Sequence, residues 1–119
     1  MLQFEHIKEA SQALGDYALR TPCVRVAWLD AFAGGPVYCK LEQLQRTGSF
    51  KFRGAMNSLL QLDEATRGRG IVTASAGNHG LGVATAAAMR GCKAKIFVPE
   101  NVASAKRHKL QALGVELVI

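Results

Sequence analysis

The chain has 119 residues with 49% apolar content, 15 basic and 9 acidic side chains, and a formal net charge of +6. It has the length of one domain, and it contains neither an apolar run that could span a membrane nor the apolar core of a signal peptide, so we expect a cytoplasmic protein. The basic excess would suit nucleic acid, but the C-terminal lysines and arginines flank periodic segments without interleaved aromatic residues, so we expect a solvated surface and no nucleic-acid partner.

The first 42 residues predict one helix and two strands. Apolar side chains recur at helical spacing over Phe4–Leu14, and Gly15 follows as a stop signal. The Thr-Pro pair at 21–22 then favours extended backbone, because the proline ring disfavours helix in the residue before it. Residues 24–26 continue as a strand, and a second strand is predicted over 37–42, where apolar and polar residues alternate after a Gly-Gly-Pro turn.

A Thr-Gly-Ser turn at 47–49 precedes a predicted amphipathic helix. Apolar side chains lie at helical spacing over 52–60, and we expect this helix to end near residue 62. The side chain of Thr47 or Ser49 is expected to cap its first turn.

The second half of the chain alternates strands with helices. Strands are predicted at 71–75, 94–98 and 115–119, and helices at 78–90 and 104–113. The strands are short and apolar, which is typical of parallel strands covered on both faces. This order predicts an α/β fold in which right-handed βαβ units build a parallel sheet. We expect the last strand to have unpaired edge groups that favour self-association.

The cysteines and histidines do not form a recognisable ligand set. Cys23, Cys39 and Cys92 are odd in number and widely spaced, which fits a reducing compartment, and we expect them to be small buried side chains. The three histidines lack metal-ligand spacing, so no metal site is expected.

The turn Ser-Ala-Gly-Asn-His-Gly-Leu-Gly at 75–82 lies where ligands bind in open parallel sheets, beyond the carboxyl end of a strand. Its small residues would let backbone approach a ligand, and the helix that follows directs free N–H groups and the positive end of its dipole at the turn. An anion site and a turn that is small only for packing both remain open. The glycines do not follow the G-x-G-x-x-G order of a dinucleotide site.

Lys51 lies between Phe50 and Phe52 just after the Thr-Gly-Ser turn. Flanking phenylalanines would disfavour the ammonium form, which is what a nucleophilic amine requires. The alternative is a lysine whose stem packs at a helix end while its amine reaches solvent.

The stretches TGSFKFRGA and TASAGNHG, in this order and separation, resemble the two signatures of the β-family (fold type II) pyridoxal-phosphate enzymes, in the threonine/serine dehydratase and serine racemase branch. The resemblance extends over essentially the whole chain. It implies a tryptophan synthase β-like fold, truncated: residues 1–54 as the N-terminal part of the large domain that carries the cofactor lysine, and 55–119 as most of the small α/β domain. The rest of the large domain, with its phosphate-binding loop, is absent, so we expect this fragment alone to be inactive.

The resemblance also implies roles for individual residues. Lys51 would bind pyridoxal phosphate covalently and move the α-proton of the substrate, Phe50 would lie against the cofactor ring, and Asn78 would hydrogen-bond its phenolic oxygen. The substrate carboxylate is expected at Ser75, Gly77, Asn78 and His79. Apart from the resemblance, Arg53 is expected to be a helix-start or structural residue, because no chemistry here demands it.

The expected reaction is β-elimination from a hydroxy amino acid such as L-threonine or L-serine, which gives a 2-oxo acid and ammonia. Racemases of this branch resemble Ser-Ser-Gly-Asn-His, with a second serine that supplies a proton from the other cofactor face, whereas this chain has Ala76. Racemisation should therefore be weak. A serine racemase or another ammonia-lyase of this fold, a non-catalytic truncated or split module and, more distantly, a nucleotide-binding domain remain alternatives. A homo-oligomer is expected for the complete enzyme.

Overall fold

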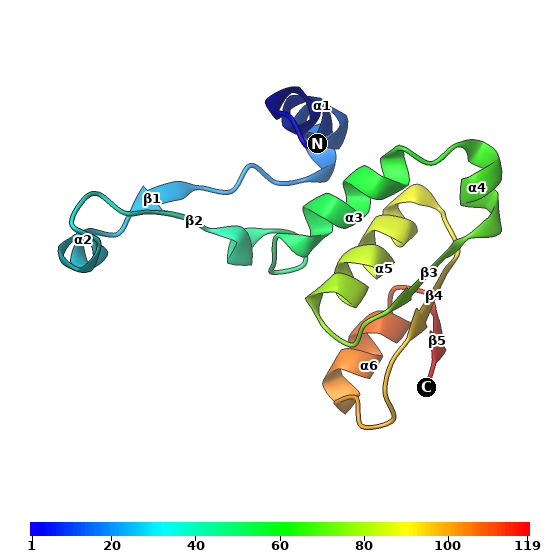
Figure 1. The fold of residues 1–119 in the computed structure, drawn as a ribbon. Coiled ribbons are helices and arrows are strands. Elements are labelled where there is room, and N and C mark those ends of the chain that lie inside the picture. Colours follow the sequence, from blue (N-terminus) through cyan, green and yellow to red (C-terminus); the bar gives the residue numbers. More distant parts are fainter.

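A computed structural model describes residues 1–119, the whole chain, as a body of helices and sheet with a projecting arm (Figure 1). The chain extends over 48 × 36 × 26 Å, with a radius of gyration of 16.7 Å. A compact domain of this length has a radius of gyration of about 13.5 Å. The arm accounts for the excess, because it leads away from the remaining elements.

The arm consists of β1 (Cys23–Arg25), α2 (Ala27–Ala33) and β2 (Tyr38–Lys40). The two strands pair antiparallel, as their alternating residues allow. Helix α2 was not predicted from the sequence. It ends at Gly34, whose left-handed backbone (φ 69°) accommodates the reversal toward β2.

The sheet of the body contains β3 (Ile71–Ala74), β4 (Ala94–Phe97) and β5 (Glu116–Val118) in the order β3-β4-β5, with both pairings parallel. Helices α5 (Asn78–Arg90) and α6 (Ser104–Gln111) connect these strands. The predicted α/β fold with parallel βαβ units is confirmed.

The expectation that the strands are covered on both faces is wrong for this chain. Helices α5 and α6 lie on one face of the sheet (Figure 1). On the other face the side chains of Val72 and Phe97 are 68% and 42% exposed. The strands therefore carry apolar side chains that no other part of this chain covers.

Three further helices precede the sheet: α1 (Phe4–Leu14), α3 (Lys51–Leu60) and α4 (Glu64–Arg69). The bounds of α1 are as predicted, and Gly15 follows it with φ 39°. Helix α3 ends slightly earlier than expected, and α4 was not predicted. Asp63 caps α4 by accepting a hydrogen bond from the backbone N–H of Thr66 at 2.6 Å.

The predicted cap of α3 by Thr47 or Ser49 is wrong. Phe50 occupies the cap position with helical backbone angles (φ −65°, ψ −16°), and no side chain caps the helix. The Ser49 hydroxyl is buried without a hydrogen-bond partner, and the Thr47 hydroxyl donates to the Ser49 carbonyl at 3.5 Å. Other contacts must therefore fix the start of this helix.

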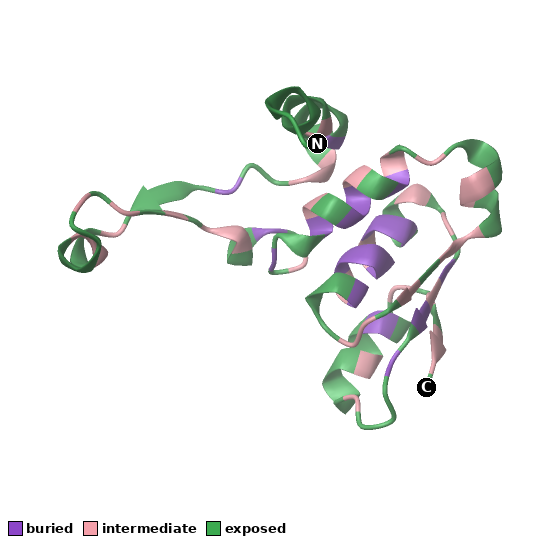
Figure 2. Ribbon diagram, viewed as in Figure 1, coloured by how far each residue is buried: buried purple, intermediate pink, exposed green.

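The core lies mainly between α3 and α5, which run side by side with their buried residues facing each other (Figure 2). Phe52 and Met56 on α3 are fully buried, and α5 presents alanines and glycines that allow the two helices to approach closely. A second buried cluster joins α5 to β4 and α6 through Ala84, Ile96 and Leu110.

The expected burial of the cysteines is wrong. Cys23 is exposed, and Cys39 and Cys92 are half-buried. Two of the three belong to the arm, which has little core of its own. None of the helices is long and apolar enough to cross a membrane.

Candidate active site

Lys51 is the first residue of α3 and is exposed. The nitrogen lies 4.9 Å from the centre of the Phe50 ring, which is itself 59% exposed. Phe52 is completely buried in the core. The expectation that both phenylalanines surround the amine is therefore wrong, because residues two apart on a helix point in different directions.

Phe50 and Lys51 line a cavity of about 520 Å³ between α3, β3 and the first turns of α5. Ser58, Thr73 and His79 also line it, and seven of its 12 lining residues are hydrophobic. Small-molecule sites typically have volumes of about 300 to 1,000 Å³ and mostly apolar walls with a few polar groups. The cavity therefore has the size and lining of a site for a small organic molecule.

The turn after β3 leads directly into α5. The Ser75 hydroxyl accepts a hydrogen bond from the N–H of Gly77 at 3.2 Å, and Gly77 is the cap residue of α5. Asn78 and His79 form the first turn of α5 and are exposed. Since the first N–H groups of a helix have no partner within the helix, this end can bind an anion.

Two glycines of the turn sequence serve backbone packing. A Cβ atom on Gly80 would lie 2.2 Å from the Ser75 carbonyl oxygen, and one on Gly82 would lie 3.2 Å from the carbonyl carbon of Lys51. Gly77, in contrast, has no such atom within 4 Å. The packing interpretation therefore holds for Gly80 and Gly82, and α5 touches both the turn and the backbone of Lys51.

The predicted site residues divide between two cavities. Phe50, Lys51 and His79 line the cavity described above. Gly77 and Asn78 line a second cavity of about 120 Å³. Ala76, Leu81, Lys106, Lys109 and Leu110 complete its lining. Ser75 lines neither of the two. The structure therefore brings Lys51 together with His79 in the larger cavity. Asn78 lines the smaller one with Lys106 and Lys109, which were not predicted as site residues.

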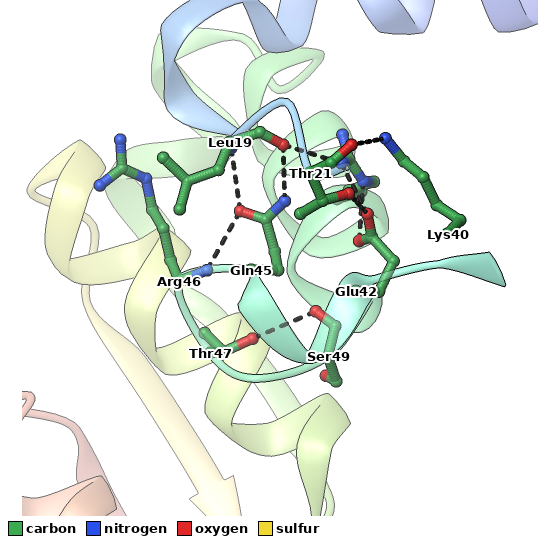
Figure 3. A network of polar contacts seen from close by, with 9 residues as sticks. Leu19, Thr21, Lys40, Glu42, Gln45, Arg46, Thr47 and Ser49 are labelled. Carbon is green, nitrogen blue, oxygen red and sulfur yellow. Dashed lines mark hydrogen bonds and ion pairs between the residues drawn. The ribbon is translucent and has the colours of Figure 1, made fainter. Parts of the chain in front are cut away.

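A partly buried polar network joins residues on both sides of Lys51 in the sequence, and it was not predicted (Figure 3). Arg53 donates two hydrogen bonds to the carboxylate of Glu42, at 2.9 and 2.8 Å. The hydrogen bonds from Arg53 hold the pKa of Glu42 down to about 2, and Glu42 raises the pKa of Arg53 in turn. The only sequence signal was the presence of opposite charges on either side of the Thr-Gly-Ser turn.

Comparison with known proteins identifies relatives over the whole chain. A family model described as "pyridoxal-phosphate dependent enzyme" matches residues 15–119. The chain is 43% identical over 119 residues to an L-threonine ammonia-lyase of Thermotoga maritima. This match covers 100% of this chain and 30% of the relative. It is 42% identical over 115 residues to an L-threo-3-hydroxyaspartate ammonia-lyase of a Pseudomonas species, covering 97% of this chain and 36% of the relative.

Among solved structures, the crystal structure of a serine racemase from Dictyostelium discoideum superposes with a TM-score of 0.92 at 37% identity. The match covers 98% of this chain and 38% of the racemase. The chain thus spans about a third of the length of the relatives that it matches.

Proposed function

This chain belongs to the pyridoxal-phosphate dependent enzyme family, and from that premise we propose that Lys51 is the residue that binds the cofactor. The observation that carries the proposal is the position of Lys51. It lines a cavity beside the Phe50 ring, and it is the first residue of α3, which packs against α5. The family resemblance of the Thr-Gly-Ser-Phe-Lys segment supports the same residue.

The residues of this cavity fit the aldehyde and the aromatic ring of pyridoxal phosphate. The cofactor carries an aldehyde, which reacts with a primary amine, and an aromatic ring, which can pack on Phe50. Lys51 is exposed and accessible to such a molecule, and the cavity has room for it. We further propose that Asn78, at the start of α5, hydrogen-bonds the phenolic oxygen of the cofactor.

We propose that the reaction is a β-elimination from a hydroxy amino acid. Lys51 takes the proton from the α-carbon, and a double bond forms between the α- and β-carbons as the β-carbon to oxygen bond breaks. The ammonium of Lys51 can return a proton to the departing hydroxyl, which leaves as water. Hydrolysis of the enamine gives a 2-oxo acid and ammonia. The cofactor, when bound, supplies the electron sink that makes the α-proton acidic enough to be removed.

The substrate is held, in this proposal, by the turn after β3. Ser75, Gly77, Asn78 and His79 would bind the substrate carboxylate together with the free N–H groups of α5. In this proposal the bound substrate would present its α-carbon to Lys51. Holding the base and the carbon together would lower the barrier by several kcal/mol, as in other intramolecular reactions. L-Threonine and L-serine are the proposed substrates. One relative is named for L-threonine and the other for L-threo-3-hydroxyaspartate, and both names support a hydroxy amino acid.

Racemisation is the second candidate, because a serine racemase is among the structures most similar to this chain. Two-base racemisation needs a proton donor on each side of the α-carbon. The turn presents the methyl group of Ala76, which has no proton to donate. We therefore propose elimination as the main reaction.

The cofactor assignment is tested on a longer polypeptide that contains this chain and has the length of its relatives, by incubation with pyridoxal phosphate, reduction with borohydride and mapping of the labelled peptide. Label is expected on Lys51 and is expected to disappear in Lys51→Ala. Lys8 provides a matched control, since it is also exposed and its amine lies 5.8 Å from the centre of a phenylalanine ring. Lys8→Ala should leave the Lys51 label unchanged, and equal labelling of both lysines in the unmodified chain would contradict the proposal.

The reaction itself is tested on a longer polypeptide that contains this chain and has the length of its relatives. Formation of 2-oxo acid and ammonia is expected from L-threonine or L-serine, and it should be lost in Lys51→Ala. We propose a homo-oligomer for that polypeptide. Cofactor binding without any turnover of hydroxy amino acids would favour a non-catalytic module instead.

A further inference from the structure

The segment that leads to Lys51 is tied to an earlier part of the chain by an ion pair. Glu42 lies in a short 3-10 helix, Glu42–Leu44, and Arg53 in the first turn of α3. The Arg53 Nε and Nη2 atoms contact different oxygens of the carboxylate, so the pair is bidentate. The side chains of Arg53 and Glu42 are only 30% and 16% exposed, and the Thr21 hydroxyl donates a further hydrogen bond to Glu42 at 2.6 Å. This geometry is typical of the stronger ion pairs in proteins.

Gln45 reinforces the connection (Figure 3). Its side chain is 4% exposed and makes two hydrogen bonds of 3.0 Å with the backbone of Leu19, one with the N–H and one with the carbonyl. Arg53 also donates to the Leu19 carbonyl, at 2.8 Å. The backbone of Leu19 is therefore held by residues on both sides of Lys51 in the sequence.

The turn between Gln45 and Arg53 has one further side-chain anchor, Arg46, which donates to the carbonyls of Tyr17 at 2.6 Å and Asp16 at 3.1 Å. No side chain caps α3, and the Ser49 hydroxyl has no hydrogen-bond partner. Gly48 has left-handed backbone (φ 71°), and its N–H donates to the Gln45 carbonyl at 2.7 Å. A helix start without a capping side chain depends on tertiary contacts. Here the apolar ones are the burial of Phe52 and the packing of Gly82 on the Lys51 backbone, and the polar ones are those of Arg53 with Glu42 and Leu19.

We propose that Glu42 and Arg53, supported by Gln45, are positioning residues that fix the start of α3 and thereby the point from which the Lys51 amine enters its cavity. The proposal rests on the proposed role of Lys51. The pair remains ionised at neutral pH, since the pKa of Glu42 is about 2. Without Glu42, the guanidinium two residues after Lys51 would lose its partner, and the turn would lose one of its anchors.

The test compares Glu42→Gln and Arg53→Lys with the unmodified chain, each within the longer polypeptide in which the cofactor assignment is tested. Glu42→Gln keeps the shape of the side chain but removes its charge, and Arg53→Lys keeps the charge but removes the bidentate contact. The matched control is Glu116→Gln, which breaks the exposed ion pair of Lys95 and Glu116 on the sheet. Two quantities are measured: hydrogen exchange of the backbone amides at 46–53, and labelling of Lys51 relative to Lys8 by pyridoxal phosphate and borohydride.

Glu42→Gln is expected to speed exchange at 46–53 by about tenfold, the factor that loss of a charged hydrogen bond implies, while exchange in β3 and β4 stays unchanged. The preference of the label for Lys51 over Lys8 should fall several-fold. Arg53→Lys should give exchange rates and a labelling preference between those of the unmodified chain and Glu42→Gln. Glu42→Asp retains the charge and should therefore bring both quantities part of the way back to their values in the unmodified chain. Glu116→Gln should change neither quantity.

The outcomes separate this inference from the proposed function. If the unmodified chain labels Lys51 selectively and Glu42→Gln changes neither exchange nor labelling, the inference is wrong and the proposed function stands. If Glu42→Gln speeds exchange equally in all elements, the pair is a general stabilising contact and the inference is also wrong. If the unmodified chain shows no preference for Lys51, the proposed function fails, and faster exchange confined to 46–53 still supports the anchoring of the turn.

Discussion

Single residues set how closely α5 approaches the turn after β3, and Gly80 makes the tightest contact. Its absent Cβ would meet the backbone oxygen of Ser75 at 2.2 Å, and backbone cannot move aside as a flexible side chain can. We therefore expect Gly80→Ala to lower the free energy of unfolding by about 1 to 3 kcal/mol, although alanine is the better helix former. Urea unfolding measures this change.

Gly54 supplies the control for Gly80→Ala. It lies within α3, and a Cβ there would meet no atom within 4 Å. Gly54→Ala should therefore raise the free energy of unfolding by about 0.5 to 1 kcal/mol through helix propensity alone. Equal effects of the two substitutions would show that the contact with Ser75 is not limiting.

Glu42 gives the stability of the chain a dependence on pH. Its pKa is lowered from 4.5 to about 2 in the folded chain, chiefly by the hydrogen bonds from Arg53. A lowered folded pKa contributes stability that is complete above the unfolded pKa and disappears as pH falls through the folded one. The free energy of unfolding should therefore fall between pH 4.5 and about 2.

Urea unfolding of the unmodified chain and of Glu42→Gln over that pH range measures the contribution of Glu42. The decrease should be smaller in Glu42→Gln, which has no carboxylate to protonate at this position. The capping carboxylate of Asp63, whose pKa is also lowered, is present in both chains, so it does not affect the difference. Identical pH profiles would contradict the assignment.

Ala76 is the residue at which we expect the balance between elimination and racemisation to be set. Ala76→Ser would place a hydroxyl in the turn, and a positioned proton donor typically contributes at least a hundredfold to proton transfer. In a longer polypeptide that turns over L-serine, we expect the ratio of D-serine to 2-oxo acid to rise by about tenfold or more. Chiral chromatography of the products measures this ratio, and Ala76→Gly is the control without a hydroxyl.

Among the elements, the packing of α3 against α5 is the contact on which the body depends. Phe52 is fully buried in this interface, so Phe52→Ala should lower the free energy of unfolding by about 3 to 5 kcal/mol. Phe50 is 59% exposed, and Phe50→Ala should change it far less. Thermal unfolding of the two variants tests the assignment, and similar losses would mean that Phe50 also belongs to the core.

Elements with strong periodic signals could be predicted from the sequence, and short ones could not. Helices α1 and α5 have long apolar patterns followed by glycine, and their bounds are confirmed. Helices α2 and α4 have seven and six residues, too few for a periodic pattern, and Asp63, which caps α4, was the available signal. The expected domain boundary between residues 54 and 55 lies within α3, and this division of the chain stays a prediction.

The candidate site could be predicted only in part, for a related reason. Lys51 and the turn after β3 are local patterns that sequence reasoning can identify. The ion pair of Glu42 and Arg53 depends on a reversal of the chain at Gly48, which brings residues 11 positions apart into contact. The division of the predicted residues between two cavities depends on how α3, α5 and α6 pack, which no local pattern encodes.

For the molecule as a whole, the exposed face of the sheet is expected to promote self-association. Val72 and Phe97 lie on this face, and β3 and β5 are both edge strands. We expect sedimentation velocity to show association that increases with concentration. Val72→Lys should weaken the association by about tenfold, because it removes the burial energy of one valine side chain. Ala65→Lys adds the same charge on the exposed surface of α4 and should leave association unchanged.

The arm is closed at its base, because the N–H of Leu41 donates to the carbonyl of Pro22 at 2.9 Å and the chain returns to the point at which it departed. Residues 23–40 are therefore bracketed by two ends that already touch. Excising them and joining the ends by a tight turn would require no rearrangement of Glu42, Arg53 or Lys51. The arm is accordingly a separable unit of the chain, and a shortened gene product that lacks it should still present the lysine at the start of α3.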